Sequence, residues 1–510
     1  MRKIIMLCCA FVPLSLLAQN AAKAIKVANP VPYANSITPE DLKKHLYIVA
    51  GKEMEGRGTG TAGERRAAAY IDSQFKALGL LPGNKDSYQL YWPVFQDSTI
   101  STGLEVNGKT FEADKDFTVN PNMAYSATMS SSEVVFVGYG VSDSTKDDYK
   151  GVDVKGKIVL VLPGATPAGT SARRPAALFI QEAAAKNGAA AVLLVQTNFP
   201  RPAGLKLGQQ YTNAFRKTIY PNTFTISEAV AEAIMGPDYK TARETIKAGN
   251  APAKTYNANI TLEFAKKTSK IQSSNVIGYV EGSDKRDEFV FITSHYDHLG
   301  KRDSVIYYGA DDDGSGTVSV IELAEAFAKA KAEGKGPRRT VVFMTVAGEE
   351  RGLWGSAFYG DNPTFPLEKT TVDLNIDMIG RTDPERKGDS SNYVYVVGDD
   401  KLSTDLRPIS EGMNKKFAKM ELDYKFNDPN DRQQIYYRSD HYNFARKGVP
   451  IIFYFDGIHA DYHKPSDTPD KINYVLMTKR ARFVFHTAWE MANRNDMLKR
   501  DLKLNMPGRN

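Results

Sequence analysis

The second half of the chain places imidazole and carboxylate groups directly after short apolar runs. His295 and Asp297 follow the β-rich run at residues 289–292, and Asp312 lies in the glycine-rich turn at residues 309–316. In open α/β sheets, ligands bind where strands end and helices begin. Because imidazole and carboxylate groups are common zinc ligands, their presence at two such turns indicates a metal site.

Further polar groups follow three later apolar runs. They are Glu349 and Glu350 after residues 340–347, Asp377 after residues 372–376, and Asp461, Tyr462 and His463 after residues 451–455. A buried carboxylate without a partner is costly, so two adjacent acids at the end of a buried strand need a cation nearby. The pattern therefore predicts a cationic site at the strand ends.

The elements that must position these groups alternate along the chain. We predict strands at residues 276–280, 289–294, 340–346, 372–378, 393–397 and 450–455, and helices at residues 315–332, 404–420 and 474–494. Strands that alternate with helices favour an α/β fold, here a mixed, mostly parallel sheet that is covered by helices on both faces.

Two helix starts are predicted upstream of this region. Thr38 precedes Pro39 and two acids, which is typical of an N-cap followed by a first helical turn. Thr61 and Glu64 form a capping box, in which the Glu64 carboxylate is expected to reach back to Thr61. The helix that begins there is expected to end at Gly79.

Residues 101–262 read as a separate module. Short strands are predicted at residues 133–137, 157–162 and 189–195, and an alanine-rich helix at residues 175–186. The composite GVDVKGKIVLVLPG…AAKNGAAAVLLVQ resembles the protease-associated (PA) domain, a small β-rich unit inserted in certain exported peptidases. A generic α/β insertion is the alternative.

The N-terminal residues are typical of a secretory signal peptide. A basic pair at residues 2–3 precedes an apolar run at residues 4–17, and Ala18 provides a small residue at the cleavage point. We therefore predict a signal peptide at residues 1–18, an exposed leader at residues 19–37, and a periplasmic or extracellular location.

Composition and charge argue against several other classes. Both cysteines, Cys8 and Cys9, lie in the predicted signal peptide, so the mature chain would have no disulfide and no thiolate ligand. The formal net charge of the 510 residues is only +6 and there is no basic run, which argues against a nucleic-acid partner. Beyond the signal peptide no stretch is apolar for long enough to predict a membrane span.

Taken in chain order, the motifs HYDH, GADDDGSG, GEE, NIDMIG and DYHKPSDT resemble those of the co-catalytic zinc aminopeptidases of peptidase family M28. The resemblance covers residues 55–79 and 275–495. It implies a zinc-peptidase catalytic domain formed by residues 38–100 and 263–510, with the PA domain at residues 101–262 inserted between them.

The resemblance also implies two zinc ions per chain. His295 and Asp377 would bind one ion, Glu350 and His463 would bind the other, and Asp312 would bridge the two. A set of imidazole and carboxylate ligands also accepts other divalent metals, such as cobalt or manganese.

Catalytic roles follow from the same resemblance. Glu349 would be the general base, Tyr462 would stabilise the oxyanion, and Asp297 would orient the imidazole of His295.

The turn around Asp312 carries two more acids. Asp311 and Asp313 are interpreted as turn-forming residues rather than ligands, and the resemblance implies a cis peptide bond between Asp312 and Asp313. His459 is interpreted as a supporting or surface residue near His463.

Residues 438–441, Arg-Ser-Asp-His, resemble a family segment near the substrate pocket, which makes Arg438 and Asp440 candidate substrate-binding residues. A capped helix start is the alternative interpretation. A carboxypeptidase would need a cationic fork for the terminal carboxylate of its substrate. Arg438 is the one candidate for such a fork, and it is interpreted more simply as the partner of Asp440.

The expected function is that of an exported di-zinc metallo-aminopeptidase, a hydrolase that removes N-terminal residues from peptides with a free N-terminus. The resemblance implies hydrolysis by a metal-bridging hydroxide, with Glu349 as the base. Alternatives on the same fold are a carboxypeptidase or dipeptidase, and a glutaminyl cyclase with one zinc. A receptor-like binding protein on a peptidase scaffold is the non-enzyme alternative, but such a protein should have lost ligands that are present here.

Overall fold

The computed structural model describes residues 27–144, 146–164, 176–202, 207–213, 218–247 and 252–504. The predicted signal peptide and the first part of the predicted leader lie outside these residues. Within the described ranges, no helix has the length and apolar character that crossing a membrane requires.

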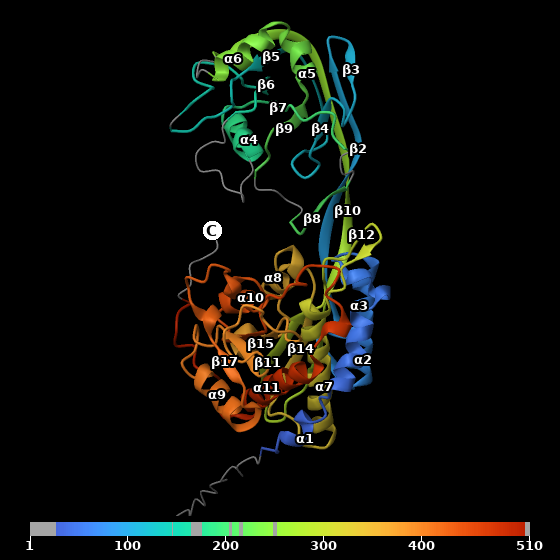
Figure 1. Ribbon diagram of the computed structural model, residues 1–510, viewed down its shortest axis with the longest axis vertical. Helices are drawn as coiled ribbons and strands as arrows, with labels where there is room; N and C mark the ends of the chain where they lie inside the picture. Colours follow the sequence, from blue (N-terminus) through green and yellow to red (C-terminus); the bar gives the residue numbers. More distant parts are fainter. Residues whose placement is uncertain are drawn as a thin grey trace, which may run out of the picture.

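One continuous mixed sheet of 16 strands forms the framework of the molecule (Figure 1). At one end its order is β17 (Glu421–Asp423), β16 (Tyr393–Val397), β18 (Ile451–Phe455), β15 (Thr370–Ile376), β11 (Lys285–His295), β14 (Arg339–Val346) and β10 (Lys254–Val280). β11 pairs in parallel with β14 and β15, and β15 pairs in parallel with β18. β10 and β16 are antiparallel to their neighbours β14 and β18. The predicted fold class is confirmed.

Helices cover both faces of this part of the sheet. One face carries α2 (Pro39–Val49), α3 (Ala62–Ala77), α7 (Gly316–Ala332) and α11 (Tyr474–Asn493), and the other carries α8 (Trp354–Asp361) and α10 (His441–Arg446). On the first face Phe327 of α7 lies 5.5 Å from Trp489 of α11, and on the second Phe291 lies 5.4 Å from Phe444, measured between ring centroids. Strands buried on both faces read as continuous apolar runs, which is why the sequence located them well.

Two long strands, β2 (Gln89–Val106) and β10, connect this region to a second one (Figure 1). The second region contains β3 (Lys109–Phe111), β4 (Phe117–Val119), β5 (Ala127–Phe136), β6 (Ile158–Val161), β7 (Ala191–Val195), β8 (Leu207–Tyr211) and β9 (Asn222–Ile226), with α4 (Ala176–Lys186), α5 (Glu228–Met235) and α6 (Asp238–Lys247). It has apolar cores of its own. The predicted boundaries at residues 100/101 and 262/263 lie inside β2 and β10, whose antiparallel pairing continues through both points.

The two predicted helix starts are present, with one difference. The hydroxyl of Thr38 accepts the N–H of Asp41 at 3.1 Å, and that of Thr61 accepts the N–H of Glu64 at 3.3 Å. The Glu64 carboxylate, however, accepts the N–H of Gly60 and the hydroxyl of Ser273 instead of reaching back to the Thr61 N–H. That prediction was wrong because the Thr61 N–H is already donated to the Gly58 carbonyl.

Candidate metal centre

The five predicted metal ligands meet at the carboxyl ends of the parallel strands. β11 ends at His295, β15 ends one residue before Asp377, and β14 leads into the turn that holds Glu350. Asp312 comes from the turn before α7, and His463 from the loop after β18. Adjacent parallel strands present their carboxyl ends at one edge of a sheet, so residues far apart in the chain converge there.

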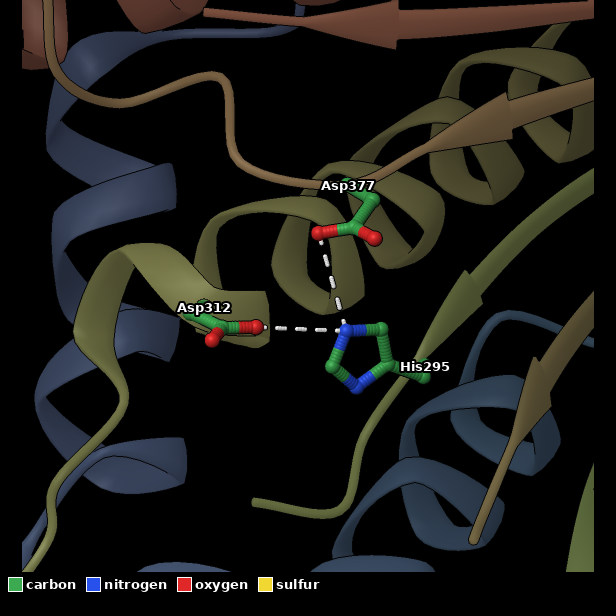
Figure 2. Close-up of side chains that lie close together, drawn as sticks. All are labelled: His295, Asp312 and Asp377. Atoms are coloured by element: carbon green, nitrogen blue, oxygen red, sulfur yellow. Dashed lines mark ion pairs between the residues drawn. The ribbon is translucent and has the colours of Figure 1, made fainter. Parts of the chain in front are cut away.

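The first group of ligands surrounds one ring nitrogen of His295. Figure 2 shows the carboxylates of Asp312 and Asp377 pointing toward the same nitrogen. His295 Nε2 lies 3.3 Å from Asp312 Oδ1 and 3.6 Å from Asp377 Oδ1. All three residues are buried, and their donor atoms lie within 4.8 Å of one another.

The second group uses the other oxygen of Asp312. His463 Nε2 lies 3.1 Å from Asp312 Oδ2 and 3.2 Å from Glu350 Oε2. The Asp312 carboxylate therefore directs Oδ1 toward His295 and Oδ2 toward His463. A carboxylate shared in this way has the geometry of a bridging ligand between two cations.

The electrostatics of these groups fit bound divalent cations. The buried atoms His295 Nε2, Asp312 Oδ2 and Glu350 Oε1 have no hydrogen-bond partner among the described residues. Zinc binds imidazole nitrogen and carboxylate oxygen, which are the donors present. Enclosure by the protein raises the pKa of Glu349 well above its ordinary value, and the nearby carboxylate of Glu350 raises it further. The unpartnered donor atoms and the cluster of imidazole and carboxylate groups thus fit a site for a divalent cation.

Asp311 and Asp313 hold the turn that presents Asp312, in agreement with their interpretation as turn-forming residues. Asp311 Oδ1 accepts the N–H of Gly380 at 2.7 Å, and Asp313 Oδ1 accepts the N–H groups of Gly316 at 2.7 Å and Met378 at 3.1 Å. These bonds tie the turn to the loop after β15. The peptide bond between Asp312 and Asp313 is cis, as the resemblance implied.

His459 and Asp467 support the same turn. His459 is buried, and its Nε2 lies 3.2 Å from Asp311 Oδ2. The Asp467 carboxylate accepts the N–H of Asp312 at 3.2 Å and that of Asp311 at 3.0 Å. Asp467 stands inside the motif DYHKPSDT, and no local pattern in the sequence distinguishes it as a support of this turn.

Arg57 was also missed, and it joins the segments that carry His295 and Asp312. Its guanidinium is fully buried, and among the described residues it donates to main-chain carbonyls alone. These are the carbonyls of Tyr296 at 2.6 Å, Tyr308 at 2.8 Å, Gly309 at 2.8 Å and Val49 at 2.9 Å. The one signal in the sequence is a lone arginine between Gly56 and Gly58. Its partners are distant in the chain and no local pattern identifies them.

Asp297 connects His295 to Glu349. His295 Nδ1 lies 3.1 Å from the main-chain oxygen of Asp297 and 3.8 Å from its Oδ1, so the imidazole is oriented mainly by the main chain. The carboxylate accepts the hydroxyl of Thr59 at 2.7 Å and the N–H of Glu349 at 3.1 Å. The hydrogen bond from the Glu349 N–H therefore fixes the backbone of Glu349, the predicted base.

A pocket opens beside the predicted metal ligands. Its lining is acidic on the metal side and mostly apolar elsewhere, and comprises Asp312, Glu349, Asp377, Met378, Ile435, Arg438, Phe453, Phe455, Ile458 and Tyr462. Arg438 Nη2 donates to the Tyr462 hydroxyl at 3.0 Å.

The interpretation of Arg438 as the partner of Asp440 was wrong. Within the described ranges no carboxylate lies within 4.0 Å of the Arg438 guanidinium, and Asp440 Oδ1 accepts the hydroxyl of Ser356 at 2.5 Å. Asp440 is fully buried and precedes α10 without a side-chain capping bond. Arg438 thus lines the pocket, while Asp440 is buried against α8.

The chain is similar to known proteins both in its sequence and in its fold. Residues 275–488 match the model of peptidase family M28. A probable leucine aminopeptidase of Arthroderma otae is 28% identical over 218 residues, which are 41% of this chain and 56% of that protein. A probable zinc metalloprotease of Pyricularia oryzae is 32% identical over 163 residues, which are 29% of this chain and 31% of that protein. The matches thus span about half or less of these relatives.

Among solved structures, the aminopeptidase from Aneurinibacillus sp. strain AM-1 aligns with a TM-score of 0.53 and 20% sequence identity. The alignment covers 94% of this chain and 100% of that one, so the two share a fold. The match to the family model therefore identifies residues 275–488 as similar to peptidase family M28, and the structural likeness shows that the fold is shared.

Proposed function

We propose that the protein is an exported di-zinc aminopeptidase that removes N-terminal residues from peptides in the periplasm or the medium. The observation that carries the proposal is the Asp312 carboxylate, which directs one oxygen to each of two imidazoles. Glu349 lines the pocket beside this centre and belongs to neither group of donor atoms. Residues 101–262 would form an inserted PA domain.

Two zinc ions, when bound, would polarise the scissile carbonyl and supply a water nucleophile at neutral pH. His295 and Asp377 would hold one ion, Glu350 and His463 the other, and Asp312 both. Glu349 takes a proton from water at its carboxylate and delivers it to the leaving amine. The main-chain bond from Glu349 to Asp297 keeps this carboxylate in place during the transfer.

Tyr462 is suited to stabilise the negative charge that develops on the carbonyl oxygen. Its hydroxyl accepts a hydrogen bond from Arg438, which leaves the phenolic proton free to be donated to substrate. Burial raises the pKa of Tyr462 well above its ordinary value, as does the nearby Asp312 carboxylate, so the phenol remains protonated. A donor aimed at the developing charge acts mainly in the transition state.

Tyr462→Phe is expected to lower kcat by about 10²-fold without loss of zinc, since removing one oxyanion donor typically has an effect of this size. The measurement is steady-state hydrolysis of an aminoacyl reporter alongside the zinc content. Tyr436→Phe, which removes a buried phenol outside the pocket lining, is the matched control and should leave kcat unchanged. An unchanged kcat in Tyr462→Phe would contradict the role.

The charges of the pocket favour a substrate amine. Asp312, Glu349 and Asp377 line it on one side, and Arg438 is the only cation among the described lining residues. The Arg438 guanidinium donates one N–H to Tyr462 and shares the pocket lining with three acids, so the balance of charge disfavours a terminal carboxylate. The apolar remainder of the pocket fits an apolar side chain on the N-terminal residue.

The test compares peptides that differ only at their ends. We expect a peptide with a free amine and an apolar first residue to be shortened from the front, and its N-acetylated form to resist cleavage. Amidation of the C-terminus should change the rate little. Mass spectrometry of the products over time distinguishes the ends. Cleavage that survives acetylation and is abolished by amidation would replace this proposal with a carboxypeptidase.

A further inference from the structure

We propose that His298 is a further metal ligand, which gives the ion held by Glu350 and His463 four protein ligands instead of three. The inference rests on the di-metal centre of the proposed function but does not depend on which peptides are cleaved. His298 follows three residues after His295, just beyond the end of β11.

His298 lies against the carboxylates of the second group. Its Nδ1 is 2.8 Å from Glu350 Oε1 and 3.8 Å from Asp312 Oδ2. The donor atoms of His298, Asp312 and Glu350 all lie within 4.8 Å of one another. The group formed by His295, Asp312 and Asp377 meets the same limit.

The hydrogen bonding of His298 distinguishes a ligand from an ordinary buried histidine. The residue is 1% exposed, and neither of its ring nitrogens has a hydrogen-bond partner within the described part of the chain. Buried polar side chains almost always have such a partner. Nδ1 and Glu350 Oε1 are close without pointing at each other in hydrogen-bond geometry. Two donor atoms that are close but not hydrogen-bonded to each other are placed as two ligands of one metal ion would be.

The protein fixes the imidazole by packing. Gly309 has φ +54°, and a Cβ there would lie 2.4 Å from His298 Cγ, so only glycine leaves room for the ring. The N–H of His298 is donated to the Arg57 carbonyl at 3.3 Å, and the Arg57 guanidinium holds the Gly309 carbonyl at 2.8 Å. The ring is thus held between two segments that also position His295 and Asp312.

His463 and His298 approach the same carboxylates from different directions. Their rings are 5.9 Å apart with an angle of 68° between their planes. The His463 side chain is 39% exposed, whereas that of His298 is fully buried. A solvent-accessible ligand exchanges with water more readily than a buried one, so the buried His298 should be the more persistent of the two imidazole ligands.

The arrangement makes the two metal positions unequal. One position has an imidazole and two carboxylates, and the other has two imidazoles and two carboxylates. Catalytic zinc can expand to five ligands, so the fourth protein ligand still leaves a place for water. We therefore expect the second ion to be the last removed by a chelator.

The test measures zinc binding to the full chain in a chelator-buffered titration. His298→Ala is expected to weaken one of the two sites by more than about 100-fold and to leave the other unchanged, because replacing a supporting residue weakens metal binding by only about 10–100-fold. His298→Asp, which offers a carboxylate at the same position, should restore much of the affinity. His486→Gln is the matched control, since His486 of α11 is a buried histidine that stacks on Phe417 instead of approaching the donor atoms, and both sites should keep their affinity.

X-ray absorption of the zinc-loaded protein separates a ligand from a residue that only positions Glu350. Three imidazoles shared by two ions are expected in the wild type, and two in His298→Gln. Equal imidazole scattering in the two proteins, or titrations that coincide, would overturn the inference. Circular dichroism and thermal unfolding of the metal-free variants exclude a folding defect as the cause of lost zinc. Loss of one site in His298→Ala together with cleavage of acetylated peptides would reject the aminopeptidase and keep the ligand.

Discussion

Glu349→Gln is expected to keep both zinc ions and to lose turnover by about 10³-fold or more. General acid–base catalysis contributes typically 10²–10⁴-fold, and glutamine cannot take up the proton. The substitution preserves the shape of the side chain and the main-chain bond to Asp297. The negative charge removed is not part of either group of donor atoms, so the ions should remain.

The experiment pairs zinc content with kcat for two adjacent glutamates. Glu350→Gln, one residue away, changes a predicted ligand and should lose zinc from one site along with activity. The pair therefore distinguishes a base from a ligand at positions with the same amino acid. Loss of zinc in Glu349→Gln, or substantial turnover in that variant, would show that Glu349 is not the base.

Much of the fold was predictable because its strands are buried on both faces. The runs that became β14 and β18 are mostly apolar, whereas β15 carries Asp373 and Asn375 between its apolar residues, and both ends of each strand lie close to the predicted bounds. β11 begins at Lys285, earlier than the predicted start at residue 289, because its first residues are polar. Polar groups that follow such runs lie at one edge of the sheet, which predicts a shared cationic site, and the resemblance to peptidase family M28 then assigned five residues between 295 and 463 to it.

The long strands β2 and β10 were not predictable in the same way. Between residues 264 and 275 the sequence of β10 is polar and partly exposed, and it lacks the clear alternation of a half-buried strand. Its structure depends on pairing with β2, a partner more than 150 residues away in the chain. The predicted domain boundary at residues 262/263 therefore lies inside β10, where the pairing with β2 continues.

Several residues around the site had no local signal. Arg57 bonds to carbonyls of segments about 240 residues away, and a main-chain acceptor imposes no residue type on its partner. His298 stands in the same short motif as His295, but its spacing alone does not tell a ligand from a surface residue. Asp440 is the acid nearest to Arg438 in the sequence, which suggested an ion pair between them. In the structure Arg438 instead donates to the Tyr462 hydroxyl.

Asp312→Ala is expected to weaken zinc binding at both positions, whereas the loss of any other single ligand should weaken only one. The physical reason is that Asp312 Oδ1 faces His295 and Oδ2 faces His463, so its deletion takes one donor from each ion. Its charge also offsets the repulsion between two divalent cations, which acts at short range in a buried site of low dielectric. Without Asp312, two predicted ligands remain at the first position and three at the second, so in a chelator-buffered titration the first site should empty and the second should bind zinc more weakly.

The matched control for this prediction is Asp311→Asn. The amide oxygen of the introduced asparagine would still accept the Gly380 N–H, so the turn should persist and both ions should remain bound. The measurement is zinc per chain after equilibration, with kcat determined on the same samples. Two zinc ions per chain in Asp312→Ala would refute the bridging assignment. An unchanged zinc affinity at one of the two sites would assign Asp312 to the other position only, and its second oxygen would then be an ion-pair partner instead of a ligand.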